Sequence, residues 1–170
     1  MSLFDDRGAE FSECRKYRYS LWEKWDNSKP YVMFVGLNPS TATETKFDPT
    51  IVRVRNFAFD NEYGGFYMTN LHPFITAYPP ELIRACTHHE KLNRSIMLSI
   101  AKRCKDVVFA WGSFIEAKIP GEWAERTFPN AKALIINQDG SPRHPLYVPG
   151  DTKLIDYKPV NFNQWKRSNL

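Results

Sequence analysis

Residues 31–40 read YVMFVGLNPS, and the change of character within this stretch decides the fold. The run at 31–35 is apolar and rich in aromatic and β-branched residues, which is typical of a buried strand. Gly36, Asn38 and Pro39 then bring in residue types that favour turns. We therefore expect a buried strand that stops abruptly and presents polar groups at its carboxyl end.

Three further runs, at 66–69, 106–110 and 132–136, have a similar composition, and helical segments separate them. Alternating strands and helices are the signature of a parallel sheet that is covered by helices on both faces. We therefore predict an α/β fold with three layers, α/β/α, around a four-stranded and mainly parallel central sheet. The segment KYRYSLWEKW at 16–25 alternates aromatic and charged residues, and we expect it to add an edge strand or a hairpin.

The expected helical segments are bounded by recognisable signals. The first has Asp48 as its N-cap and Gly64 beyond its end. The second spans about 79–104 and ends in basic residues, which suit the C-terminal end of a helix dipole. The third, at 113–128, contains a Pro-Gly pair, which predicts two short helices in place of one.

The composition is that of one ordinary globular domain. We expect a single domain over 1–170, since no repeat or linker divides the chain, with a flexible polar tail at 161–170. The chain has three cysteines, an odd number without a C-x-x-C pair, which predicts reduced thiols at Cys14, Cys86 and Cys104. No run approaches the roughly 18 apolar residues that span a bilayer, so we expect a cytoplasmic protein without a membrane segment.

Charge and motif content restrict the partners and cofactors. A formal net charge of +4 is compatible with a polyanionic partner, but it is too small for a protein that coats DNA, so nucleic-acid contact should be local. The four histidines show neither H-x-x-x-H nor H-E-x-x-H spacing, so we expect no metal. The P-loop, dinucleotide and hydrolase-elbow patterns are also missing, and we expect no cofactor.

Each expected strand ends in a cluster of polar or turn-forming residues. The clusters read GLNPST, TNLHPF, AWGS and, after a turn, RHPLYVP. In an open parallel sheet, ligands bind at the carboxyl ends of the strands. We therefore expect Asn38, Asn70 and His144 to meet at one edge of the sheet and to line one concave pocket.

Taken singly, each cluster also has a purely structural interpretation. Asn38 is a typical residue of an Asx turn, and Asn70 after a strand is usually a turn residue. Trp111 is expected to fill the core, and Asp48 is better explained as a helix cap than as a general base. The coincidence of several such clusters at one predicted edge favours a binding site.

The ordered motifs LNPSTA, DPT, TNL, AWG and HPLY resemble the bacterial and phage family called domain of unknown function 1643, from about Tyr17 to about Asp151. The same order is similar to the uracil-DNA glycosylase superfamily. That superfamily has a Gly-x-Asp/Asn-Pro loop, a strand ending in Asn, a strand ending in Trp-Gly, and a late His-Pro loop. GLNPS is closest to the mismatch-specific branch, in which Asn replaces the acid of the more active enzymes.

This resemblance implies a uracil-DNA glycosylase-like fold with a pocket for a flipped base and cleavage of an N-glycosidic bond. Asn38 would hold a water against the sugar, and His144 would stabilise the charge on the departing base. Asn70 would read the base edge, while Phe47 or Phe74 stacks on the base. The other implied substrate contacts are Gly36, Leu37, Pro39, Ser40 and Leu146.

The chain departs from the superfamily at two places. Ser40 stands where the mismatch-specific branch has Gly. The stretch after His144 lacks the serine-rich continuation that binds DNA phosphate and carries a wedging leucine in that superfamily. Leu146 is a candidate for this wedge. We therefore expect single-stranded or distorted DNA as the partner more than intact duplex. Two alternatives stay open: an enzyme that acts on a free nucleobase or nucleotide, and a non-catalytic reader of modified or single-stranded DNA.

Overall fold

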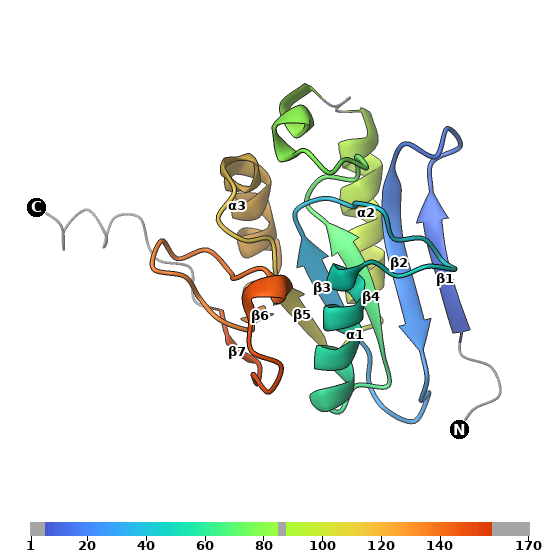
Figure 1. Ribbon diagram of the computed structural model, residues 1–170, viewed down its shortest axis with the longest axis vertical. Helices are drawn as coiled ribbons and strands as arrows, with labels where there is room; N and C mark the ends of the chain where they lie inside the picture. Colours follow the sequence, from blue (N-terminus) through green and yellow to red (C-terminus); the bar gives the residue numbers. More distant parts are fainter. Residues whose placement is uncertain (1–5, 85–87, 158–170) are drawn as a thin grey trace, which may run out of the picture.

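The computed structural model describes residues 6–84 and 88–157, which form a seven-stranded sheet in the order β1-β2-β4-β3-β5-β6-β7 (Figure 1). The strands are β1 (Asp6–Phe11), β2 (Arg18–Lys24), β3 (Val32–Gly36), β4 (Gly65–Asn70), β5 (Asp106–Phe109), β6 (Lys132–Ala133) and β7 (Ile155–Asp156). The α-helices are α1 (Pro49–Asp60), α2 (His88–Ala101) and α3 (Lys118–Thr127). Three short 3-10 helices are η1 (Pro79–Arg84), η2 (Ile115–Ala117) and η3 (Pro145–Tyr147).

The centre of the sheet is parallel. Strand β3 pairs in parallel with β4 on one side and with β5 on the other, and β5 pairs in parallel with β6. The predicted parallel arrangement of the runs at 31–35 and 106–110 is therefore confirmed. The predicted four-stranded sheet is wrong, because antiparallel strands extend it at both ends. The fold is α/β with a mixed sheet of seven strands.

The segment 16–25, predicted to add an edge strand or a hairpin, forms the inner strand β2, and residues 6–11, for which no strand was predicted, form its hairpin partner β1 at the edge. Strand β1 pairs antiparallel with β2, and β2 pairs antiparallel with β4, as the reversed direction of its arrow shows in Figure 1. The side chain of Glu23, on β2, is fully buried. The carboxylate of Glu23 accepts hydrogen bonds from Arg7 and Arg55, so this buried negative charge is matched by two guanidinium groups.

The strand expected at 132–136 is shorter than predicted. Strand β6 ends at Ala133, and the chain then leaves the sheet for a turn in which Asn137 N–H donates to Ser141 O at 2.8 Å. The apolar residues that follow β6 stay inside because they pack against the core, with Leu134 buried. A buried apolar run thus does not by itself mark the length of a strand.

The helix signals were right at the start of α1 and placed the division before α3 too late. The Asp48 carboxylate caps α1 by accepting from Ile51 N–H at 3.0 Å, as predicted. The segment 79–104 divides into η1 and α2. The segment 113–128 contains two short helices, η2 and α3, but α3 begins at Lys118 and continues through Pro120. The proline falls in its first turn, where the missing N–H is not needed.

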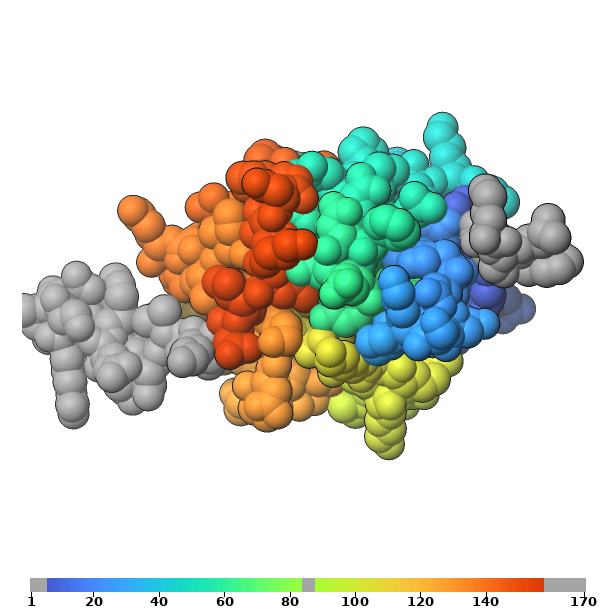
Figure 2. Space-filling view, turned by 90° about the horizontal axis from the view of Figure 1, so that it is seen from below, coloured from blue at the N-terminus to red at the C-terminus, as the bar shows by residue number. Residues whose placement is uncertain are grey.

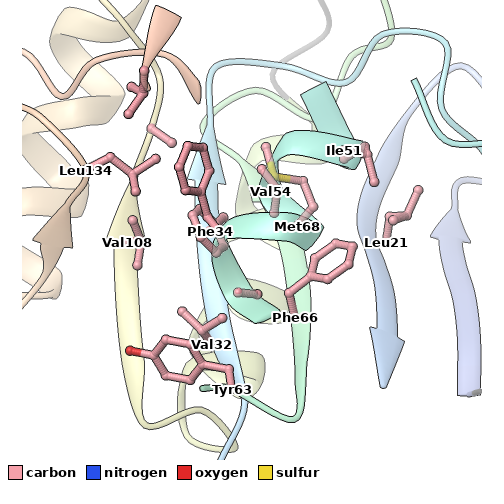
Figure 3. Packing of buried hydrophobic residues seen from close by; sticks show 14 of the residues in the cluster. Leu21, Val32, Phe34, Ile51, Val54, Tyr63, Phe66, Met68, Val108 and Leu134 are labelled. Carbon is pink, nitrogen blue, oxygen red and sulfur yellow. The ribbon is translucent and has the colours of Figure 1, made fainter. Parts of the chain in front are cut away.

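Helices cover both faces of the sheet. Figure 2 shows α1, in teal and green, on one side of the molecule and α2, in yellow-green, on the other. Alternation along β3 divides its side chains between the two layers. Val32 and Phe34 pack in the cluster under α1, which Figure 3 shows, whereas Met33 and Val35 pack under α2 and α3.

Two further expectations concern thiols and membranes. Cys14 and Cys104 are free thiols, while Cys86 and the tail at 161–170 lie outside the described residues. Within residues 6–84 and 88–157, the helices are too short or too polar to cross a membrane.

Gly64, expected only to follow the end of α1, is required by a close approach of two backbone segments. Its carbonyl accepts from Trp25 N–H and Asp26 N–H, and its own N–H donates to Pro30 O at 2.8 Å. A Cβ atom at position 64 would lie 1.9 Å from Asp26 O. The contact is with backbone, which cannot rotate away, so only glycine fits between β2 and the start of β4.

The first prediction tests this contact. Gly64→Ala should lower the free energy of unfolding by about 3 kcal/mol, because the added methyl group must push two hydrogen-bonded segments apart. Urea denaturation measures the change. Gly150→Ala is the control, since its Cβ would meet only Arg53 Nη1 at 3.6 Å, and it should change stability by less than about 0.5 kcal/mol. Equal effects of the two substitutions would contradict the assignment.

Candidate functional site

A cavity of about 200 Å³ lies at the carboxyl edge of the parallel strands. It is formed by the loops that follow β3, β4 and β5, by the start of α1 and by the loop that leads into η3. Of the residues predicted from the sequence, the structure brings six into its lining: Gly36, Leu37, Asn38, Ser40, Asn70 and His144. Three of the four clusters that were predicted to meet at one edge therefore share one concave site.

Parallel pairing between β3 and β4 explains why two of the clusters meet. Gly36 is the register partner of Asn70, and Gly36 O accepts from Leu71 N–H at 2.8 Å just beyond the strand. A Cβ atom at Gly36 would lie 2.7 Å from Asn70 Oδ1 and 2.6 Å from Met68 Cε. The glycine at the end of β3 thus leaves the space that the amide of Asn70 occupies.

The Asn38 side chain is held in one orientation by two backbone carbonyls. Its Nδ2 donates to Pro39 O at 2.9 Å and to Thr76 O at 2.7 Å. Carbonyl oxygens only accept hydrogen bonds, so the amide nitrogen must face them. The Oδ1 atom is then the part of Asn38 that is left to accept a hydrogen bond from a ligand or a water. The two contacts also tie the loop after β3 to the segment that precedes η1.

Asn70 carries an unsatisfied donor. The residue is 1% exposed, and its Nδ2 is buried without a hydrogen-bond partner among the described residues. The backbone is fixed, because Asn70 O accepts from Asn93 Nδ2 at 2.8 Å. A buried amide N–H that stays unpaired costs about 1–3 kcal/mol. Since Asn70 lines the cavity, this donor is available to a ligand acceptor.

His144 is a neutral donor in this environment. The backbone N–H of Leu146 donates to His144 Nδ1 at 3.2 Å, so Nδ1 is the unprotonated nitrogen and Nε2 carries the proton. Burial lowers the pKa of His144, and the negative charge of Asp48 partly offsets this effect. At neutral pH the imidazole is therefore uncharged and offers Nε2–H.

Helix α1 and the loop after β5 hold the turn that carries His144. Arg53, on α1, donates through Nε to Pro145 O at 3.4 Å and through its terminal nitrogen to Val148 O. From the other side, Gly112 N–H donates to Pro142 O at 2.8 Å. The His-Pro loop is thereby fixed to two separate elements, which sets the position of the imidazole at the cavity.

Four predicted residues are not in the cavity lining. Phe47 packs under the Arg7 guanidinium, 4.3 Å from its ring centroid, and Phe74 packs on Tyr17. Pro39 is a buried residue of the loop after β3, and Leu146 is exposed on η3. The structure therefore does not bring either predicted stacking ring to the cavity.

Nine other lining residues were not predicted as site residues, and three of these carry a charge or an aromatic ring into the site: Arg18, Asp48 and Phe114. Phe114 supplies the aromatic wall that was expected from Phe47 or Phe74, and its place just after the AWGS cluster was the available signal. Trp111, by contrast, is buried against Phe109 with ring centroids 4.5 Å apart, as the prediction of a core role required. The described residues contain no group of three or more His, Cys, Asp and Glu side chains that could hold a metal.

Comparison with known proteins identifies the family. The family model described as protein of unknown function (DUF1643) matches residues 18–146, and the chain belongs to this family. No curated protein and no solved structure matches the chain. The matched range contains all six lining residues that were predicted from the sequence.

The second prediction concerns the charge of Asp48. Asp48→Asn should lower the pKa of His144 further, because it removes the nearby negative charge, while Asn still serves as an N-cap for α1. A histidine whose native pKa is lowered contributes stability above its unfolded pKa of about 6.5, and that stability is lost as the pH falls. NMR titration of the imidazole resonances measures the change. Asp151→Asn, an exposed substitution, is the control, and an unchanged or raised pKa in Asp48→Asn would contradict the prediction.

Proposed function

We propose that this member of the DUF1643 family is a uracil-DNA glycosylase-like protein that binds a flipped or modified nucleobase in the cavity and hydrolyses its N-glycosidic bond. The observation that carries the proposal is the meeting of Asn38, Asn70 and His144, from two loops and the end of β4, in one cavity of about 200 Å³. Sites for drug-sized ligands are typically about 300–1,000 Å³, so a smaller cavity suits a single heterocycle. The order of motifs that resembles the glycosylase superfamily points in the same direction.

The proposed reaction needs a positioned water. The water oxygen bonds to C1′ of the sugar, the C1′–N bond breaks, and its electron pair stays on the base. The Oδ1 atom of Asn38 can accept a hydrogen bond from this water, since Nδ2 is occupied by Pro39 O and Thr76 O. A neutral amide is too weak to deprotonate water before attack. The water proton is therefore released to solvent once the sugar has acquired oxocarbenium character.

The base departs with a negative charge that the site must stabilise. His144 can donate from Nε2–H to an acceptor on the base, because Leu146 N–H fixes the tautomer and burial keeps the ring neutral. Asn70 can pair with the base edge through its unsatisfied Nδ2. Phe114 lines the cavity, and its ring can stack on the base.

Exposed apolar side chains next to the site support an unpaired strand as partner. Leu146 is 43% exposed and Tyr147 is 75% exposed on η3, directly after His144. Tyr78 and Phe114 are also exposed, and Phe114 lines the cavity. Such side chains stack on bases or separate them when a duplex is already open. We therefore propose single-stranded or distorted DNA as the nucleic-acid partner.

The third prediction tests the proposed roles. His144→Ala should lower the single-turnover rate of base release by about 10²–10³-fold, the usual effect of removing one preorganised donor to a developing anion. Asn38→Ala should act similarly, whereas Asn70→Ala should relax the choice of base, because an amide that pairs with the base edge discriminates among substrates. A panel of modified-base oligonucleotides, single- and double-stranded, provides the substrates.

The matched control for His144 is His88→Ala, which removes an exposed imidazole from α2 and should leave the rate unchanged. If the unmodified protein releases no base from any substrate, hydrolysis is contradicted. If Asn70→Ala then still weakens oligonucleotide binding, the protein is a reader of the base and not an enzyme.

The fourth prediction concerns the partner. Affinity for a single-stranded oligonucleotide should fall with added salt, with a log-log slope of about 0.7 for each phosphate that is neutralised. Leu146→Ala should weaken binding roughly tenfold, which corresponds to about 1.4 kcal/mol. Leu98→Ala is the control, since Leu98 is similarly exposed, at 42% against 43%, but lies on α2. Fluorescence anisotropy measures both effects, and binding that is independent of salt would indicate a free nucleotide as the ligand.

A further inference from the structure

Arg18 is a buried cation in the lining of the cavity. It lies at the start of β2, and the residue is 2% exposed. One terminal nitrogen donates to Ala42 O at 2.7 Å, while Nε is buried without a partner among the described residues. The ion pairs found in the described part of the chain do not include Arg18. No carboxylate there neutralises this guanidinium by direct contact.

The negative charge of Asp48 acts on Arg18. Burial lowers the pKa of Arg18 to about 10, and the charge of Asp48 opposes this change. A pKa of about 10 keeps the guanidinium positive at neutral pH. Its distance from the Asp48 carboxylate is too long for an ion pair. The Asp48 carboxylate is itself engaged as the cap of α1, where it accepts from Ile51 N–H.

A charge buried in this way destabilises a protein unless something compensates it. Taking an ion out of water costs several kcal/mol in real proteins, and replacing it with an apolar side chain of similar volume is often neutral or stabilising. Two donors at the same cavity, Arg18 Nε and Asn70 Nδ2, have no acceptor within residues 6–84 and 88–157. A ligand that brings acceptor atoms and negative charge into the cavity would satisfy both.

We infer that Arg18 makes the cavity an anion site, which selects the anionic form of a nucleobase-sized heterocycle. If the protein releases a base, as the proposed function requires, the same charge acts on the reaction. Arg18 then stabilises the electron pair that remains on the base nitrogen when the C1′–N bond breaks. His144 supplies a neutral hydrogen bond, and Arg18 supplies the positive charge. Because Arg18 is 2% exposed, only a group inside the cavity can reach it, and a backbone phosphate outside cannot.

The test uses free heterocycles whose ring N–H ionises near neutral pH, 5-nitrouracil as a pyrimidine and xanthine as a purine. The absorbance of each is titrated with pH, alone and with saturating protein. The bound heterocycle should have a pKa lowered by about one unit, which equals tenfold tighter binding of the anion. Arg18→Met should abolish the shift, and Arg18→Lys should retain part of it. Arg126→Met, which removes an exposed charge from the end of α3, should leave it intact.

Thermal stability separates an anion site from a structural arginine. Arg18→Met should melt at the same temperature as the unsubstituted protein or higher, because an apolar side chain replaces an uncompensated charge. A melting temperature several degrees lower would overturn the inference, since the charge would then serve the fold. The titration of the unsubstituted protein needs no variant and decides the question even if Arg18→Met does not fold.

The remaining outcomes are also decisive. A bound heterocycle with an unchanged pKa, a shift that survives Arg18→Met, or failure of both probes to bind would overturn the inference. Preference for the anion in a protein that releases no base from any oligonucleotide would support the anion site and contradict the proposed hydrolysis. The two claims therefore fail separately.

Discussion

The parallel pairing of β3 with both of its neighbours is the constraint on which the site depends. Beyond the end of each ladder the backbone bonds continue, with Leu71 N–H donating to Gly36 O and Ala110 N–H donating to Val35 O, each at 2.8 Å. The loops after β3, β4 and β5 must therefore start side by side at one edge. An antiparallel β3 would send its loop to the opposite edge and would separate Asn38 from Asn70. The chemistry proposed for the cavity thus follows from strand direction.

Two buried charges in the described part of the chain have different surroundings, and the difference supports the proposed binding site. Glu23 is fully buried but receives hydrogen bonds from Arg7 and Arg55, so its charge is satisfied within the fold. Arg18 is almost as deeply buried, and in the part of the chain that the structure describes its side chain has a single hydrogen bond, from one terminal nitrogen to Ala42 O. Charges and donors that are left unsatisfied stabilise a ligand more than they stabilise the empty protein. The unsatisfied groups at the cavity would then lower the stability of the ligand-free fold and strengthen the binding of a ligand.

Much of the architecture could be predicted from local pattern, and the failures have physical reasons. Local sequence patterns were enough to predict the strands at 31–35 and 106–110 and the helix cap at Asp48, because these features depend on residues that are close in the sequence. Strand β7 has two exposed residues that pair with β6, and no local pattern marks such an edge. Arg18 sits in a segment that alternates charged and aromatic residues, as an exposed edge strand does. It is buried because the loop that carries Ala42, 24 residues away, covers it.

The most direct test of a nucleobase site is a crystal structure of the protein soaked with free nucleobases. We expect a planar ring inside the cavity, stacked on Phe114, with acceptor atoms within hydrogen-bond distance of Asn70 Nδ2, Arg18 Nε and His144 Nε2. The Oδ1 atom of Asn38 should face the ring nitrogen that carries the sugar in a nucleoside. A ring bound elsewhere on the protein, or a cavity closed by side chains of the protein itself, would contradict a nucleobase site.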